Sequence, residues 1–332
     1  MLRPAITVIL MLVVIGSVSV AQAVPPDVTI EELQAYKLRT DQLIGELRAE
    51  IRAVLPPELR IKERSVKYEV VINPSSVNSS ITLQGHAPTV YMDSQLVEVF
   101  DWIAESLALD LRLQGQSCTA EYLTYLSSAL NRMLQSSFEG LASPPALSPS
   151  QFFARRRDIC PFDKLSALRV DSAVRIQREL FLRSSLKLVM AHEFAHVALG
   201  HLGKTNKSID EIRQEESAAD KFAVDNLALA GTDPAEAIPG SVLWMLLDRS
   251  GADNKYATHE PGERRVSLLI DAAQQAEFLN PQLTIAAEWE GMAPHWDKGT
   301  KAVIDKARQR VLIDALGANC PECARAYVNQ HP

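Results

Sequence analysis

The stretch VMAHEFAHVALGH, residues 189–201, decides how this chain is interpreted, because it places two histidines and a glutamate on one predicted helix. His192 and His196 are four residues apart, so their rings leave the same helix face about one turn apart. That separation suits two imidazoles that bind one zinc ion. Glu193 lies beside His192, where a carboxylate can act as general base toward a water activated by the metal. The stretch therefore predicts two ligands and one base.

The residues around this motif are apolar, which strengthens the prediction of a metal site. They are Leu186, Leu188, Val189, Met190, Phe194, Ala195, Val197 and Leu199. Ionisable side chains on a buried helix need partners or a metal. The pattern therefore favours metal binding over histidines on a solvated surface.

A third ligand is expected from the ESAAD segment that begins at Glu216, twenty residues after the second histidine of the motif. Glu216 would complete a set of two histidines and one glutamate with one open position. Asp220 lies four residues later on the same helix face, where it can accept a hydrogen bond from a ligating imidazole. Glu215 is the rival ligand, but the residue four positions after it is Ala219, which cannot orient a histidine.

Besides His259, four further histidines lie outside the HExxH motif and the ESAAD segment. His201 lies at the end of the predicted helix, and its position favours a partner for the helix dipole over a metal ligand. His86, His295 and His331 have no motif around them, and we predict no part in the site for them.

These segments resemble the gluzincin metallopeptidases of the HtpX and CAAX prenyl protease type. Residues 189–201 are similar to the active-site helix of that family, and residues 215–223 are similar to its third-ligand helix. Residues 258–265 are similar to its T-H-P-x-x-x-x-R segment. The resemblance implies that His259 is a catalytic residue that helps to hold the substrate carbonyl, and that Arg265 lies near the substrate.

A strand and a helix ahead of the motif extend the resemblance. Residues 87–103 are similar to the family's strand and helix before the active-site helix, which implies an edge strand along which substrate lies. Three features depart from the family pattern: Glu260 separates His259 from the proline, the stretch between the edge strand and the active-site helix is much longer, and the spacing from His196 to Glu216 is short. That spacing is closer to thermolysin-like enzymes and is similar to ImmA-like peptidases, so the resemblance is to the gluzincin clan more than to one family.

The composition is that of a globular protein. The chain has 332 residues, of which 47% are hydrophobic and 23% charged, enough for one large domain or two small ones. Its formal net charge of -7 indicates no general affinity for nucleic acid, so the expected partner is a protein or peptide substrate. The expected fold class is α+β but mostly α: a zincin-like metallopeptidase domain with a small sheet and an active-site helix.

Apolar periodicity and turn residues predict the elements. Strands are expected at residues 65–72 and 81–93, the second either as one strand or as two short ones broken near Gly85 and Pro88. A helix capped by Asp93 or Ser94 should follow. The other expected helices span residues 28–55, 119–135, 162–182, 180–202, 208–230, 236–249, 262–278 and 297–317.

These elements suggest a division of the chain. Residues 24–64 form an N-terminal helical segment, and residues 65–280 form the zincin-like domain. A helical insertion at residues 112–180 interrupts that domain, and residues 281–332 form a C-terminal helical extension.

The N-terminus is typical of a secretory signal peptide over residues 1–23. Arg3 precedes a nearly unbroken apolar run at residues 6–20, and Ala21-Gln22-Ala23 has the A-x-A form of a cleavage site. We therefore expect a secreted or periplasmic protein. The alternative is an uncleaved membrane anchor, because residues 5–24 approach spanning length, and only then is membrane association expected.

Export would place the four cysteines in an oxidising compartment, where disulfides form. They are Cys118, Cys160, Cys320 and Cys323. Three pairings remain open, of which the simplest joins Cys118 with Cys160 and Cys320 with Cys323. A redox role for the last two is the alternative, but the chain lacks a thioredoxin-like context around them.

Together, these patterns predict an exported zinc-dependent endopeptidase with one Zn²⁺ per chain. The alternative is a zinc-binding chaperone-like or inactive protease-like protein that binds exported polypeptides. Neither the substrate nor the oligomeric state follows from the sequence.

Overall fold

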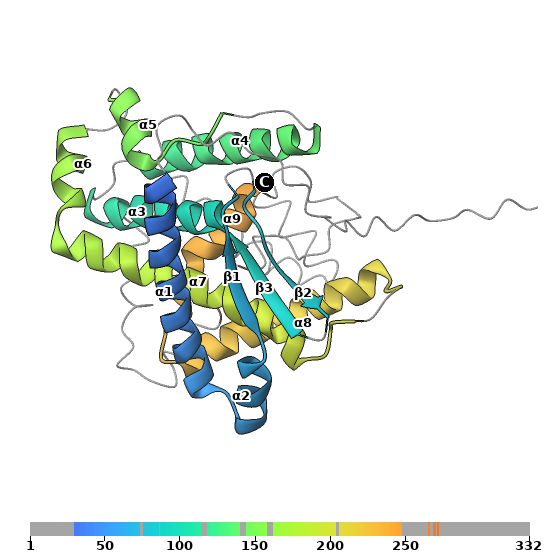
Figure 1. Ribbon diagram of the computed structural model, residues 1–332. Coiled ribbons are helices and arrows are strands. Elements are labelled where there is room, and N and C mark those ends of the chain that lie inside the picture. The colour runs from blue at the N-terminus through green and yellow to red at the C-terminus, as the bar shows by residue number, and fades with distance from the viewer. Residues whose placement is uncertain are drawn as a thin grey trace, which may run out of the picture.

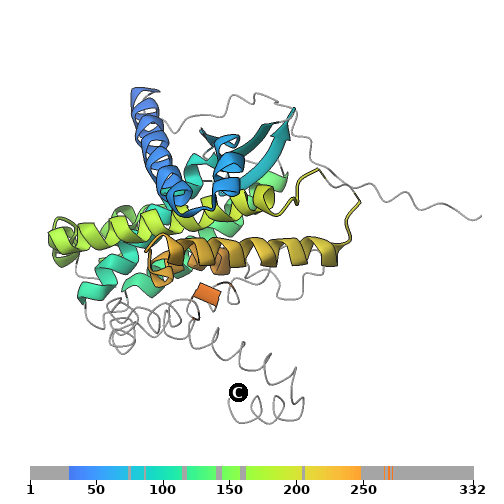
Figure 2. The same cartoon turned by 90° about the horizontal axis from the view of Figure 1, so that it is seen from below.

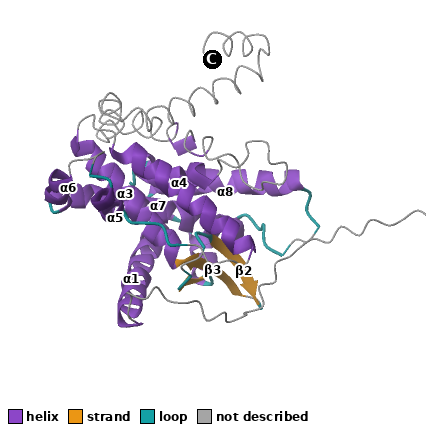
Figure 3. Cartoon of the chain, turned by 90° about the horizontal axis from the view of Figure 1, so that it is seen from above, coloured by secondary structure: helices purple, strands orange, loops and turns teal. Residues whose placement is uncertain are grey.

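The computed structural model is mostly helical with one small sheet, in agreement with the expected α+β class (Figure 3). It describes residues 30–73, 76–85, 87–113, 118–139, 144–157, 162–203 and 206–247, with Arg265, Leu268, Leu269 and Asp271. Among these residues, no helix is both long enough and apolar enough to span a bilayer.

Helix α7 (Ser172–Ala198) passes through the middle of the described core (Figure 1). It has 27 residues, and it begins where the Asp171 side chain accepts hydrogen bonds from two backbone amides of its first turn. The helices that pack against it include α1 (Ile30–Val54), α3 (Ser94–Leu113), α8 (Ile209–Leu229) and α9 (Ile238–Leu247). Its second half is buried on nearly every side, which holds the HExxH segment in a fixed position.

The predicted position of the boundary between α6 (Phe162–Arg169) and α7 is wrong. The sequence indicated one helix over residues 162–182 and a second over residues 180–202, whereas a single helix spans residues 172–198. The chain breaks at Val170 and Asp171, because the aspartate side chain caps the following helix instead of continuing the preceding one.

The sheet has three strands, β1 (Lys67–Val71), β2 (Ser79–Gln84) and β3 (Ala87–Asp93), in the order β1-β3-β2. β3 pairs in parallel with β1 and antiparallel with β2, and a turn at Gly85 joins β2 to β3. The expected pair of short strands is therefore present. The prediction that residues 87–93 form an edge strand is wrong, because β3 is central and is mostly buried.

The remaining described elements are helices around α7 and the sheet. α2 (Pro57–Arg64) precedes the sheet, and the short helix η1 (Pro234–Ala237) joins α8 to α9. α4 (Cys118–Glu139) packs on α3 and α9, and α5 (Pro149–Arg155) packs on α3. Aromatic rings of Tyr122, Phe152 and Phe153 pack together there as part of the same core cluster as α7.

Several predictions concern parts of the chain that lie outside the described residues. These are the signal peptide at residues 1–23, the helix at residues 297–317, His86, His259, His295 and His331. Three of the four cysteines, Cys160, Cys320 and Cys323, lie there too.

Candidate metal centre

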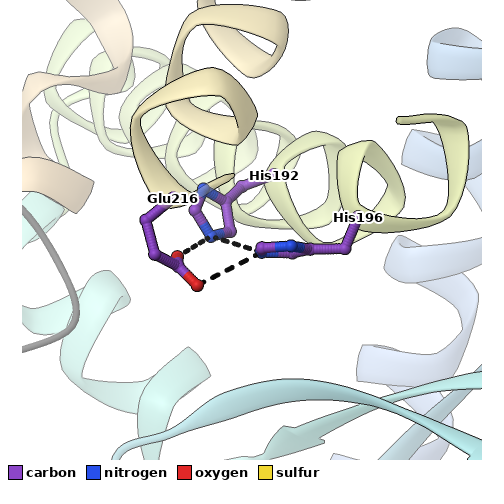
Figure 4. A group of neighbouring side chains, drawn as sticks. All are labelled: His192, His196 and Glu216. Atoms are coloured by element: carbon purple, nitrogen blue, oxygen red, sulfur yellow. Dashed lines mark hydrogen bonds and ion pairs between the residues drawn. The ribbon is translucent and has the colours of Figure 1, made fainter. Parts of the chain in front are cut away.

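The candidate site lies between α7 and α8, which pack side by side (Figure 2). His192 and His196 project from the last two turns of α7, and Glu216 projects from α8 toward them (Figure 4). These three residues form a group whose donor atoms all lie within 4.8 Å of one another. The structure thus brings together the two predicted histidine ligands and the predicted third ligand.

The spacing of the three donor atoms matches that of ligands around a single small ion. His192 Nε2 lies 3.4 Å from His196 Nε2 and 3.2 Å from Glu216 Oε2. His196 Nε2 lies 3.7 Å from Glu216 Oε1. Tetrahedral ligands about 2.1 Å from an ion lie about 3.4 Å from one another. Two imidazole nitrogens and one carboxylate at this spacing are a donor set that can hold a metal.

Asp220 orients the His192 ring from the side opposite the donor group. Its Oδ1 lies 2.8 Å from His192 Nδ1, so a proton on Nδ1 leaves Nε2 available to a metal. Burial alone would lower the pKa of His192, but hydrogen bonds to the Asp220 and Glu216 carboxylates outweigh burial and raise that pKa to about 9.

Arg265 holds Asp220 in its ionised form. Its guanidinium donates a hydrogen bond to Asp220 Oδ1, and both residues are buried, with 9% and 7% of their surfaces exposed. Burial opposes ionisation of Asp220, but the charges of Arg265 and His192 hold its pKa below the usual value. The Arg265 guanidinium also lies over the Trp244 ring of α9, 5.0 Å from the ring centroid. Arg265, which the resemblance implied near the substrate, therefore contacts Asp220 directly.

His196 has a different partner, His201. Their Nδ1 atoms are 3.0 Å apart, and both side chains are half-buried. The sequence indicated only a helix-dipole role for His201, because nothing in its spacing from His196 predicts a contact between rings within a straight helix. The contact arises because the chain turns back at the end of α7.

Glu215 does not face the histidines, in contrast to its neighbour Glu216. The Glu215 carboxylate forms an ion pair with Lys207, in the connection between α7 and α8. α8 itself begins with the predicted capping box, in which Ser208 and Glu211 each bond to the other's backbone amide. Of the two candidate glutamates, the structure thus places Glu216 at the histidines and Glu215 at the loop.

Glu193 lies next to His192 and is 7% exposed. Tyr68 of β1 is close enough for the Glu193 carboxylate to affect it, and sequence reasoning assigned this tyrosine no role. Burial, followed by the charges of Glu63 and Glu193, raises the pKa of Tyr68 well above its usual value. Among the described residues, the Tyr68 hydroxyl has no hydrogen-bond partner. It therefore remains protonated near Glu193.

The donor group, Asp220 and Arg265 all lie within a segment that matches a known family model. Residues 115–276 match the family model for Peptidase U49. The match covers just under half of the chain, including His192, Glu193, His196 and Glu216. Neither the curated proteins nor the solved structures include a match to this chain. The Peptidase U49 match supports a peptidase, and it does not single out the HtpX and CAAX protease type.

Proposed function

We propose that this peptidase is a zinc-dependent endopeptidase of gluzincin type. The observation that carries the proposal is the donor group, in which two imidazole nitrogens and a carboxylate lie 3.2 to 3.7 Å apart. Their chemistry and spacing fit Zn²⁺, which binds His and Glu in sites with an open position. His192, His196 and Glu216 would hold one ion per chain.

Bound zinc would supply a Lewis acid that polarises a peptide carbonyl and makes water at the site more acidic. The chain's own residues would move the proton. Glu193 is adjacent to the first ligand, and its carboxylate would accept the proton of the attacking water and pass it to the leaving amine.

The cellular setting of the proposal rests on the N-terminal sequence. Residues 1–23 have the form of a signal peptide, so the proposed site of action is the periplasm or the cell exterior. Substrates would then be proteins or peptides of that compartment. His259, which the gluzincin resemblance implies near the substrate carbonyl, is part of the same proposal.

Metal analysis and cleavage of a denatured protein substrate test this proposal together. We expect about one zinc per purified chain, with hydrolysis lost in chelator and restored by zinc. Glu193→Gln should retain the metal and lose hydrolysis by a factor on the order of 10² or more. Glu179→Gln is the matched control, because Glu179 lies on the same helix with an exposed side chain, and it should cleave normally.

Each result has a definite meaning. A protein without stoichiometric metal would contradict the zinc assignment. Persistent hydrolysis in Glu193→Gln would contradict the role of Glu193. Bound zinc without any cleavage would favour instead a zinc-binding, chaperone-like protein that holds polypeptides.

A further inference from the structure

The end of α7 brings His201 back onto His196 through a specific turn. Gly200 has a φ of 73°, a left-handed conformation that glycine adopts readily. The His201 amide donates to the carbonyl oxygen of His196 at 2.9 Å, and the Gly200 amide donates to that of Val197 at 3.3 Å. This pair of bonds is the Schellman motif, which places the side chain two residues after the helix cap against the last full turn.

The contact that this turn creates is usually apolar, but here it joins two imidazoles. The centroids of the His196 and His201 rings are 5.1 Å apart, and their Nδ1 atoms are 3.0 Å apart. A hydrogen bond between two Nδ1 atoms requires a proton on one of them and a lone pair on the other. The two tautomers are therefore coupled.

The other nitrogen of His196 decides which ring is the donor. His196 Nε2 faces His192 Nε2 and Glu216 Oε1, which are the other two members of the donor group. A metal ligand must offer a lone pair, so Nε2 has to be without a proton. The proton then lies on His196 Nδ1, and His201 Nδ1 accepts the hydrogen bond.

We propose that His201 is a positioning residue that holds His196 in the tautomer with a bare Nε2 aimed at the donor group. This inference deepens the proposed function and rests on it, although the tautomer itself can be measured in the metal-free chain. His201 does not belong to the metal-holding group, so it acts through His196.

Lys207 fixes the backbone from which His201 acts. Its ammonium donates to the carbonyl oxygen of His201 at 2.6 Å, and it also pairs with Glu215 on α8. The loop after α7 is thereby tied to the helix that carries Glu216. His201 is held by the turn on one side and by this lysine on the other.

Nitrogen NMR of the imidazole rings in the metal-free, full-length protein at pH 8 tests the inference directly. We expect His196 to carry its proton on Nδ1. His201→Asn keeps an acceptor at the position of Nδ1 and should preserve that tautomer. His201→Leu removes the acceptor and should yield a mixture with protonated Nε2. Leu199→Ala, a change at an exposed residue of the same helix end, is the control and should leave the tautomer unchanged.

Zinc competition with a coloured chelator gives a second readout. Loss of a residue that orients a metal ligand typically weakens metal binding about 10- to 100-fold, which is the expected effect of His201→Leu. His201→Asn should stay close to the unsubstituted protein. If the unsubstituted protein binds no zinc, the proposed function fails, while the NMR still decides the tautomer.

A proton on His196 Nε2 in the unsubstituted protein would overturn the inference, as would an unchanged tautomer in His201→Leu. If His201→Leu fails to fold, the unsubstituted protein and His201→Asn still give the decision. A folded His201→Leu protein that binds zinc as tightly as the unsubstituted one would also overturn it.

Discussion

The two histidines of the HExxH motif share one helix face but differ in what supports them. His192 lies deep between α7 and α8, and its Nδ1 contacts a carboxylate that a buried arginine holds ionised. His196 lies one turn later, half-buried, and its Nδ1 contacts the imidazole of His201 in the turn that ends the helix. One support is a carboxylate held by an arginine from a distant segment, and the other is an imidazole from the same helix end.

Because of this difference, substitutions around His192 and substitutions around His196 should have different effects on stability. A hydrogen bond to a charged partner is stronger than one between neutral groups, and removing one member of a buried ion pair leaves the other without compensation. The His192 end should therefore respond to substitution with large losses of stability. The His196 end should respond mainly through ligand orientation.

The largest effect should come from Asp220→Ala. The change leaves the Arg265 guanidinium buried without its carboxylate, so we expect the free energy of unfolding to fall by about 3 to 5 kcal/mol. Zinc affinity should fall about 10- to 100-fold, because the His192 ring loses the group that orients it. Urea unfolding and zinc competition measure the two effects.

Asp225→Ala is the matched control for Asp220→Ala. Asp225 lies on the same helix, but it pairs with Lys221 in an exposed ion pair. Such pairs contribute about 0 to 1 kcal/mol. Equal losses in the two variants would contradict the expected cost of leaving the Arg265 guanidinium buried without its carboxylate.

A smaller effect is expected from pH in the metal-free protein. The pKa of folded His192 is about 9, above its ordinary value of 6.5. Protonated His192 thus stabilises the fold fully below pH 6.5, and this stability is lost as pH rises through 9. The shift corresponds to about 3 kcal/mol. Unfolding at several pH values should show this loss, and His192→Asn should reduce it. An unchanged slope in that variant would assign the pH dependence to other groups.

The smallest effect should come from Lys207→Met at the His196 end. This change removes the hydrogen bond to the His201 carbonyl and the ion pair with Glu215, both part-buried. We expect a loss of about 1 kcal/mol, measured by urea unfolding. Lys221→Met removes an exposed ion pair only and should lose less. A loss in Lys207→Met as large as that in Asp220→Ala would show that the two ends do not differ.

The sequence predicted the parts of the fold and site that depend on local spacing. Residues four apart share a helix face, so the pairing of His192 with His196 and of Glu216 with Asp220 could be inferred from their spacing alone. The Ser208 capping box and the stop at Gly231 mark the ends of α8 by backbone chemistry that the residues themselves carry. These signals act over fewer than five residues.

The features that the sequence did not predict correctly depend on contacts between distant segments or on a change in backbone direction. The edge position of residues 87–93 was wrong because strand order depends on which segments pair, and the resemblance that implied this position does not fix the pairing. The contact of His201 was missed because a straight helix was assumed past Gly200. A glycine followed by histidine at the helix end was the available signal.

One feature of the donor group bears on the order in which the chain folds. All three donor residues and the two groups beside the histidines, Asp220 and His201, come from α7, α8 and their connection, with nineteen residues between His196 and Glu216. Closing so short a loop has a small entropic cost, and local contacts form early in folding. This helical hairpin can therefore assemble early in folding, so an ion present at that stage would meet most of the residues that bind it.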